Sequence, residues 1–350
     1  MIVNYTQIVY NRQPVPESPV HCSLDLDAPG KHAGRLELPR SGNTSGWSHL
    51  FIPIVSIKGG DGPTALVIGG VHGDEPEGQV AALRLARETL PDEVLGQLIV
   101  VPCASPEASR AYTRLWPSGA NFNRSFPGSP DGPPDEQLAD FFTRCLFPRA
   151  DVIVDMHSGG RSGLCPPWSE MHWVDDAAQR RQMVDAMLAW GTDYHFVYID
   201  IAGSGLLVGE AERQGKIVVS TELAGGGHVT AATHRIAQSG LANVLRHVGV
   251  LRGEVQQRDT PPVIGRATEV DNYLLAPETG LWETFVDLGE RVSVGQPVGQ
   301  IHFLERPERE AAVVEALTDG IVFAVRAIAT TDQGDNVAVI AREIDVEELR

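Results

Sequence analysis

Two histidines and a glutamate form a set that could bind a metal ion. His72 and Glu75 lie in the segment GGVHGDEPEG, and His157 lies in VDMHSGG. An imidazole and a carboxylate this close together in a loop can converge on one cation. Catalytic zinc sites typically use three protein ligands and leave one position for water. A lone His-x-x-Glu is often only a surface pair, but the surrounding glycines and the later DMHSG segment favour one zinc ion per chain.

A metal that hydrolyses an amide also needs a residue that takes up a proton and returns it to the leaving amine. Glu222 is the candidate, because in VVSTELAGGG it follows an apolar run and precedes glycines that leave room for a ligand. A solvent-facing glutamate at a strand end is the alternative interpretation. Asp155, just before His157, either orients that histidine as a hydrogen-bond partner or simply ends a strand.

Three further polar residues are candidates for contact with a substrate. Asn123 and Arg124 are adjacent in ANFNRSFPG; arginine can bind a carboxylate bidentately and asparagine adds a donor. Arg114, in YTRLWPSG, could polarise the scissile carbonyl as an oxyanion stabiliser. On chemistry alone, each could equally be a structural residue.

These candidates must be positioned by strands and helices, and the strongest candidates follow strand-like runs. Buried strands are predicted at ALVIGG (65–70), QLIVVPCA (97–104), DVIVDMHS (151–158) and KIVVSTEL (216–223), and helices at 79–90 and around 176–190. Strands alternating with helices predict an α/β fold with a mostly parallel, mixed sheet covered by helices on both faces. In such sheets ligands bind at the carboxyl ends of the strands, which is where His72, His157 and Glu222 fall.

Outside this α/β region the chain changes character. Alternating residues at 24–28 and 35–39 predict strands of a leading hairpin, so residues 1–50 are expected to form a β-rich N-terminal extension. The catalytic domain is then expected over 51–255, ending before a linker at 256–265.

Residues 265–350 are predicted to form a small, all-β, barrel or sandwich-like capping domain. Glycine-punctuated β-rich runs over 273–302 recur loosely over 313–341. The repeat resembles the lipoyl/biotinyl half-barrel fold, but a carrier domain needs a lysine between the repeats. Residues 255–350 contain none, which excludes the carrier function.

Composition limits the partners. The 350 residues are 42% apolar and 21% charged, and no apolar run is long enough to span a membrane. The net charge of −18 argues against nucleic acid or an anionic membrane as a partner. No signal peptide is recognisable and the four cysteines form no CxxC pair, so we expect a cytoplasmic protein with inert thiols. A small molecule is the expected partner, and a homo-oligomer is compatible with the sequence.

Taken together, HGDE, NFNRSFPG, DMHSG and TELAGGG resemble the succinylglutamate desuccinylase/aspartoacylase family, which belongs with the zinc carboxypeptidases. The resemblance covers nearly the whole chain. It implies that His72, Glu75 and His157 bind zinc and that Glu222 is the general base and acid. It further implies that the Asn123–Arg124 pair binds the substrate carboxylate and that Arg114 polarises the carbonyl.

Within the family, the longer motifs HGDEPEG, NRSFPG, DMHSGG and TELAGGG most resemble those of the N-alpha-acetyl-diaminobutyrate deacetylases of ectoine degradation. The expected function is therefore zinc-dependent deacylation of a small N-acyl amino acid, with N-alpha-acetyl-L-2,4-diaminobutyrate as the leading substrate. The alternatives are an aspartoacylase or succinylglutamate desuccinylase, a metallocarboxypeptidase acting on peptides, and a non-catalytic binding protein. Asp74 and Glu77 lie near the ligands in sequence, but their spacing assigns neither to the substrate's ammonium group.

Overall fold

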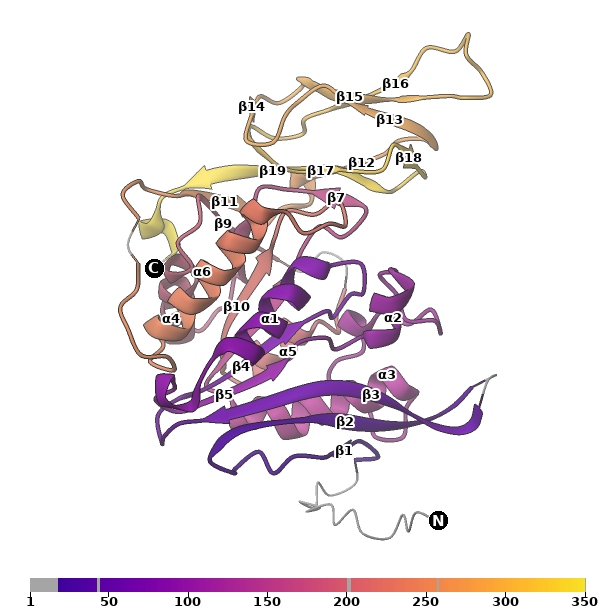
Figure 1. Cartoon of the computed structure of the whole chain (residues 1–350). Coiled ribbons are helices and arrows are strands. Elements are labelled where there is room, and N and C mark those ends of the chain that lie inside the picture. Colours follow the sequence, from indigo (N-terminus) through magenta and orange to yellow (C-terminus); the bar gives the residue numbers. More distant parts are fainter. Residues whose placement is uncertain (1–17, 43–44, 200–202, 257, 350) are drawn as a thin grey trace.

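The computed structural model describes residues 18–42, 45–199, 203–256 and 258–349. One large mixed sheet forms the body of the molecule, with helices against it, and a smaller sheet lies beyond one end (Figure 1). This confirms the predicted α/β class and its mixed sheet. Among the helices in these ranges, none is both long enough and apolar enough to cross a membrane.

Four parallel strands form the centre of the large sheet. In spatial order they are β5 (Gln97–Val101), β4 (Thr64–Gly69), β6 (Val152–His157) and β10 (Ile217–Glu222). Helices cover both faces of these strands, so almost every position is buried, which is why they read as continuous apolar runs. All four strands were predicted from such runs.

Antiparallel pairing begins on either side of this centre. β3 (Ser45–Lys58) runs against β5, and β8 (Trp168–His172) runs against β10. β9 (Tyr194–Tyr198) and β11 (Val263–Ala267) then continue the sheet in parallel with β8. The sheet is therefore parallel at its core and mixed at its flanks.

The N-terminal segment joins the large sheet as a hairpin. β2 (Gly30–Gly42) pairs with β3, and the short β1 (His21–Cys22) pairs with β2. The predicted strand at 24–28 is wrong: this stretch forms turns, in which the Asp25 side chain accepts the Asp27 amide at 2.9 Å. Residue 50, where the N-terminal extension was expected to end, lies inside β3, whose last residues, 55–58, pair with β5.

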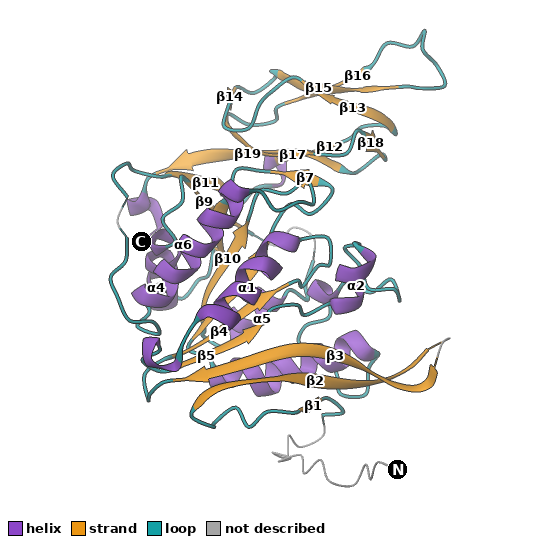
Figure 2. Cartoon of the chain, in the orientation of Figure 1, coloured by secondary structure: helices purple, strands orange, loops and turns teal. Residues whose placement is uncertain are grey.

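Six α-helices are assigned within the described residues: α1 (Pro76–Glu88), α2 (Pro106–Ala111), α3 (Pro134–Phe141), α4 (Ala177–Ala189), α5 (Leu207–Arg213) and α6 (Ala231–His247). α1 and α6 pack together on one face of the central strands, and α3 and α5 lie on the other (Figure 2). α1 begins earlier than the predicted 79–90 because Pro76 occupies its first turn, where no amide donor is needed.

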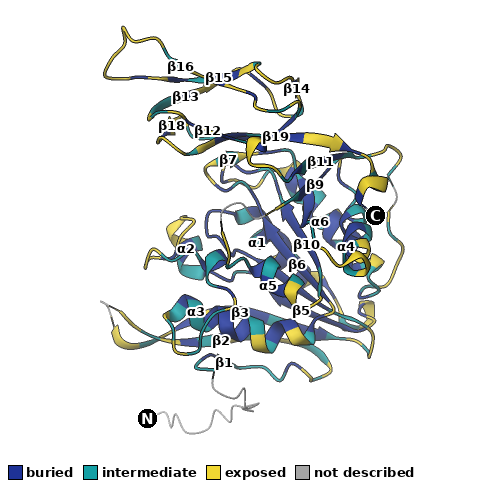
Figure 3. Cartoon of the chain, turned by 180° about the vertical axis from the view of Figure 1, so that it is seen from behind, coloured by how far each residue is buried: buried dark blue, intermediate teal, exposed yellow. Residues whose placement is uncertain are grey.

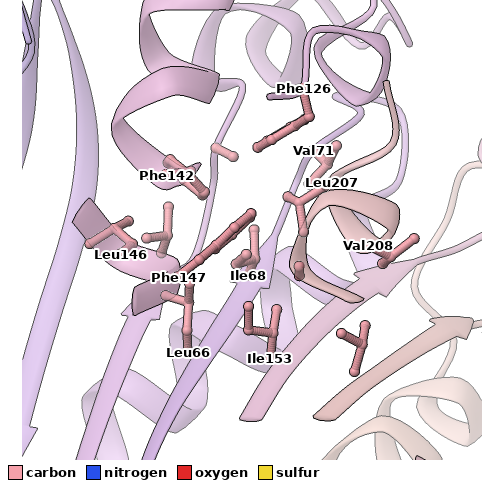
Figure 4. Packing of buried hydrophobic residues seen from close by; sticks show 14 of the residues in the cluster. Leu66, Ile68, Val71, Phe126, Phe142, Leu146, Phe147, Ile153, Leu207 and Val208 are labelled. Atoms are coloured by element: carbon pink, nitrogen blue, oxygen red, sulfur yellow. The ribbon is translucent and has the colours of Figure 1, made fainter. Parts of the chain in front are cut away.

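The α5 face holds the larger hydrophobic core. Leu66, Ile68 and Ile153 project from β4 and β6 toward Phe147 and Leu207 (Figure 4). Figure 3 shows burial concentrated in the central strands and in the helix sides that face them. A rigid sheet of this kind can hold side chains at its strand ends in fixed positions.

The C-terminal part is joined to the large sheet by strand pairing. β11 begins at Val263, inside the expected linker, and pairs with both β9 and the last strand, β19 (Asn336–Ile344). Beyond β19 lie β17 (Gly320–Arg326) and β14 (Arg291–Val292), with β12 (Tyr273–Leu275) also paired to β19.

A second sheet covers this extension. It contains β16 (Ala312–Glu315), β15 (Pro297–His302), β13 (Gly280–Thr284) and β18 (Thr330–Thr331), in that order. Trp282 and Ile301 from this sheet pack with Val322 and Ile340 from the large sheet in a separate apolar core. Residues 263–349 thus carry two sheets with one core between them.

Candidate active site

The three predicted metal ligands meet at the carboxyl edge of the large sheet. His72 and Glu75 lie in the loop between β4 and α1, and His157 is the last residue of β6. Because β4 and β6 are parallel neighbours, their carboxyl ends lie side by side. The fold therefore brings together residues that are 82 positions apart in sequence.

Glu75 lies between the two imidazoles. Its Oε1 is 2.7 Å from Nδ1 of His72, and its Oε2 is 2.7 Å from Nδ1 of His157. One ligand atom from each of the three residues lies within 4.8 Å of the others, and all three residues are buried. This is the compact His₂Glu donor set that binds zinc in hydrolases.

The outer nitrogen of each histidine faces a side-chain oxygen. Nε2 of His72 is 3.1 Å from Oδ1 of Asn121, and Nε2 of His157 is 3.0 Å from Oδ2 of Asp155. A histidine that donates from Nε2 to such an acceptor has a bare Nδ1 for a metal, and ligand histidines are usually oriented in this way. The residues present therefore fit a zinc ion.

The charge on Glu75 suits the same role. Burial alone would raise the pKa of this carboxyl, but the imidazoles of His72 and His157 hold the pKa well below its usual range. Arg114 also donates to Oε1 of Glu75 at 3.0 Å. Glu75 is therefore an ionised carboxylate in a buried position.

Glu222 stands beside this cluster. It ends β10, directly opposite His157 in the β6–β10 pairing, and it lines the same cavity. Its Oε2 is buried without a hydrogen-bond partner among the described residues. Burial raises the pKa of Glu222 well above its usual range, and the nearby carboxyl groups of Glu75 and Glu170 raise it further. A carboxyl of this kind can hold and release a proton near neutral pH.

A cavity of about 310 Å³ opens over the cluster. Its lining includes the candidate ligands, Glu222 and a number of apolar side chains. Tyr273, Ala324 and Val339 belong to that lining and come from the C-terminal strands. Both parts of the molecule therefore shape the cavity, whose volume suits a small molecule.

The three predicted substrate contacts also line this cavity. Asn123 is largely occupied: its Oδ1 accepts the Leu207 amide at 2.9 Å, and its Nδ2 lies 3.5 Å from Nε2 of His157. Arg124 donates to the Asn123 carbonyl at 2.6 Å, and Arg114 reaches Glu75 from a partly exposed position. The structure thus brings every predicted site residue to one cavity.

The glycine run after Glu222 allows two site loops to touch. Gly225 adopts a φ of +130°, and a Cβ there would lie 2.2 Å from the Gly163 carbonyl oxygen. No side chain fits at that distance, so a larger residue would push apart the loops after β6 and β10.

The two acidic residues noted in the ligand loop point elsewhere. Asp74 accepts the Arg161 amide at 3.1 Å, and Glu77 accepts the Ser158 hydroxyl at 2.6 Å. Neither lines the cavity. The carboxylate that does, besides Glu75 and Glu222, is Glu170 on β8, which the sequence analysis missed. The residues of WSEMH (168–172) do not alternate in polarity, so no sequence signal marked Glu170; once β8 is known as a strand, Trp168 and Glu170 share one face.

The sequence of this chain matches a known protein family. A family model described as the succinylglutamate desuccinylase/aspartoacylase catalytic domain matches residues 61–248. A curated relative from Halomonas elongata, named N-alpha-acetyl-L-2,4-diaminobutyric acid deacetylase, is 39% identical over 94% of this chain and 96% of its own length.

Solved structures agree with this relationship. The product-bound ectoine utilization protein EutE (DoeB) from Ruegeria pomeroyi has a TM-score of 0.89 and 38% identity, covering 93% of this chain and 99% of that one. A succinylglutamate desuccinylase/aspartoacylase from Rhodobacter sphaeroides has a TM-score of 0.88 and 38% identity, covering 94% of this chain and 100% of that one. The likeness extends across both parts of the molecule.

Proposed function

The chain belongs to the succinylglutamate desuccinylase/aspartoacylase family, and on that premise we propose that it is a zinc-dependent deacetylase of N-alpha-acetyl-L-2,4-diaminobutyrate. The products would be L-2,4-diaminobutyrate and acetate. The substrate is the one named for the Halomonas elongata relative, and the EutE (DoeB) structure supports the same assignment. The observation that carries the chemistry is the convergence of His72, Glu75 and His157 beside the unpaired carboxyl of Glu222.

His72, Glu75 and His157 would bind the zinc ion, with Asn121 and Asp155 fixing the two imidazoles from behind. When bound, zinc supplies a Lewis acid that activates water and polarises the acyl carbonyl. The arrangement leaves the cavity side of the three ligands open to substrate.

Glu222 would move the proton. Its unpaired Oε2 accepts a proton from the attacking water, and the same oxygen returns it to the nitrogen of the breaking amide bond. A cation held by the neighbouring residues would lower the pKa of Glu222 from its raised value, so the carboxylate can accept that proton.

The arginines would orient the substrate. Arg124 and the Nδ2 of Asn123, which line the cavity, would bind the α-carboxylate beside the scissile amide. Arg114, which donates to Glu75, would stabilise the negative charge that develops on the carbonyl oxygen. The first of these contacts would favour an N-acyl amino acid with a free carboxylate.

The C-terminal residues would form a flattened sandwich that caps the cavity. This assignment is supported by the apolar core between the two C-terminal sheets and by the cavity positions of Tyr273 and Val339. Such a cap narrows access and favours small substrates over peptides.

A substrate panel with metal analysis tests this function. Purified protein should contain one zinc per chain and hydrolyse N-alpha-acetyl-L-2,4-diaminobutyrate with a higher kcat/KM than N-acetylaspartate, N-succinylglutamate or short peptides. If kcat/KM were higher for N-acetylaspartate or N-succinylglutamate, the substrate assignment would be wrong. The assignment as a zinc deacylase would still stand. Cleavage of peptides alone would overturn both.

A further inference from the structure

Strand pairing places a third carboxylate on the sheet face that carries the proposed catalytic groups. Asp155 on β6 is opposite Ser220 on β10, and Ser220 is opposite Glu170 on β8. The adjacent row contains His157, Glu222 and Trp168. With strands about 4.8 Å apart, β8 lies roughly 10 Å from β6 across the cavity floor. The backbone of Glu170 is therefore roughly that far from the strand that ends in His157.

Glu170 is held rigidly and faces the cavity. The residue is 6% exposed, and its Oε2 accepts the indole N–H of Trp168 at 2.7 Å. Neither cavity arginine is hydrogen-bonded to it: Arg114 contacts Glu75, and Arg124 contacts the Asn123 carbonyl. The nearby imidazoles of His157 and His172 favour the charge of Glu170. An ammonium group on a ligand would add a direct partner to this buried carboxylate.

Aromatic rings surround this carboxylate. Trp168, Phe196 and Tyr198 all line the cavity, with ring centroids 5.1 Å apart for Trp168–Phe196 and 5.8 Å apart for Phe196–Tyr198. Aromatic faces attract cations through the ring quadrupole, and desolvation strengthens the attraction. A carboxylate and aromatic rings that line the same cavity would favour an ammonium group over a carboxylate or an aliphatic chain.

We propose that Glu170, with Trp168, Phe196 and Tyr198, binds the side-chain ammonium of the substrate and so selects basic N-acyl amino acids over neutral and acidic ones. This inference rests on the proposed function and adds its specificity determinant. Arg124 and Glu170 line the same cavity, and they would bind the carboxylate and the ammonium of one dipolar substrate. N-acetylaspartate and N-succinylglutamate would place a carboxylate against Glu170, which repels it.

The test compares two substrates of nearly equal shape. N-alpha-acetyl-L-2,4-diaminobutyrate and N-acetyl-L-norvaline differ by an ammonium in place of a methyl group. The wild-type zinc enzyme should favour the first in kcat/KM by about 10- to 100-fold, the usual effect of a hydrogen bond to a charged group. Glu170→Gln should lose most of this preference through a higher KM for the basic substrate. Its kinetics with the norvaline substrate and its zinc content should stay close to wild type.

Glu210→Gln is the matched control, because Glu210 is a buried glutamate on α5 that pairs with Arg213 outside the cavity. Its substrate preference should equal that of wild type. Equal losses on both substrates in Glu170→Gln would show a structural role and overturn the inference while the deacetylase assignment stands. If the wild-type enzyme showed no preference for the basic substrate in kcat/KM, the proposed role of Glu170 would be wrong, and no variant would be needed to show it. A wild-type enzyme inactive on both substrates would instead remove the proposed function itself.

Discussion

At the scale of single residues, the proposed zinc site depends on three buried side chains that face one another, those of His72, Glu75 and His157. His72→Ala removes one donor and leaves Glu75 with a single imidazole neighbour, so we expect the protein to lose its zinc and its activity together. Elemental analysis of purified protein measures the loss. His49→Ala, at an exposed histidine on β3, is the control and should keep one zinc per chain. A His72→Ala protein that retained full zinc would contradict the ligand assignment.

Glu222 separates proton transfer from metal binding. Glu222→Gln keeps the size of the side chain but cannot accept the proton, so kcat should fall by roughly 10²–10⁴-fold, the range for loss of a general base. Zinc content and the unfolding midpoint should change little, since Glu222 is not among the clustered donor atoms. If zinc were lost instead, Glu222 would be a ligand and the proposed role would be wrong.

The convergence of His72, Glu75 and His157 could be predicted because each lies in a short motif with a definite spacing and follows an apolar strand. Asn121 and Glu170 could not. The contact between Asn121 and His72 joins two loops, and Glu170 reaches the cavity only because β8 pairs with β10. A single sequence gives no information on that pairing.

At the scale of elements, α1 must lie close to β6 for Glu75 to reach His157. Gly78 allows this approach, because a Cβ at that position would lie 2.5 Å from the Met156 carbonyl oxygen. Gly78→Ala should therefore lower the free energy of unfolding by about 1–3 kcal/mol, the usual cost of overpacking, and should weaken zinc binding. Urea denaturation and competition with a chelator measure the two effects.

The matched control is Gly209→Ala in α5, where the nearest atom to a new Cβ is 3.9 Å away. That substitution should stabilise the protein by roughly 0.4–1 kcal/mol, because alanine restricts the unfolded chain without a clash. Equal effects at Gly78 and Gly209 would show that the close approach of α1 to β6 does not matter.

Elements with a strong apolar period were predictable, and those whose form depends on neighbours were not. The four central strands, α1 and α4 follow from their own residues. β3 was not predicted, although its positions alternate between exposed and buried, and the β2–β3 pairing makes the two strands one long hairpin. The stretch at 24–28 has the alternation of a strand, but its aspartates form turns instead.

At the scale of the whole molecule, acid stability should depend on a histidine remote from the site. Burial lowers the pKa of His195 on β9 to about 3, and Nδ1 of that histidine is 2.8 Å from the Ser169 hydroxyl on β8. The unfolded chain binds a proton below a pH of about 6.5, whereas the native protein does not. The free energy of unfolding is therefore unaffected by protonation of His195 above pH 6.5. Between pH 6.5 and pH 3 the preferential protonation of the unfolded chain lowers that free energy by at most about 1.4 kcal/mol per pH unit.

His195→Gln should remove this contribution, so its free energy of unfolding should fall less steeply than that of wild type between pH 7 and pH 5. Urea denaturation at a series of pH values measures the slopes, and both proteins carry the same metal ligands. His49→Gln, at an exposed position, should keep the wild-type slope. Parallel curves for wild type and His195→Gln would show that His195 titrates normally.

The place of β19 has a consequence for how the protein is made. It follows every other strand of the described residues in sequence, yet it lies inside the large sheet between β11 and β17. Until it emerges, both of those strands have an open edge, the form most prone to aggregation. Val339, part of the cavity wall, arrives with the same strand. Translation of a message truncated before this strand would therefore give a chain that contains every proposed zinc ligand. That chain would lack the strand that joins β11 to β17, and its cavity would lack Val339.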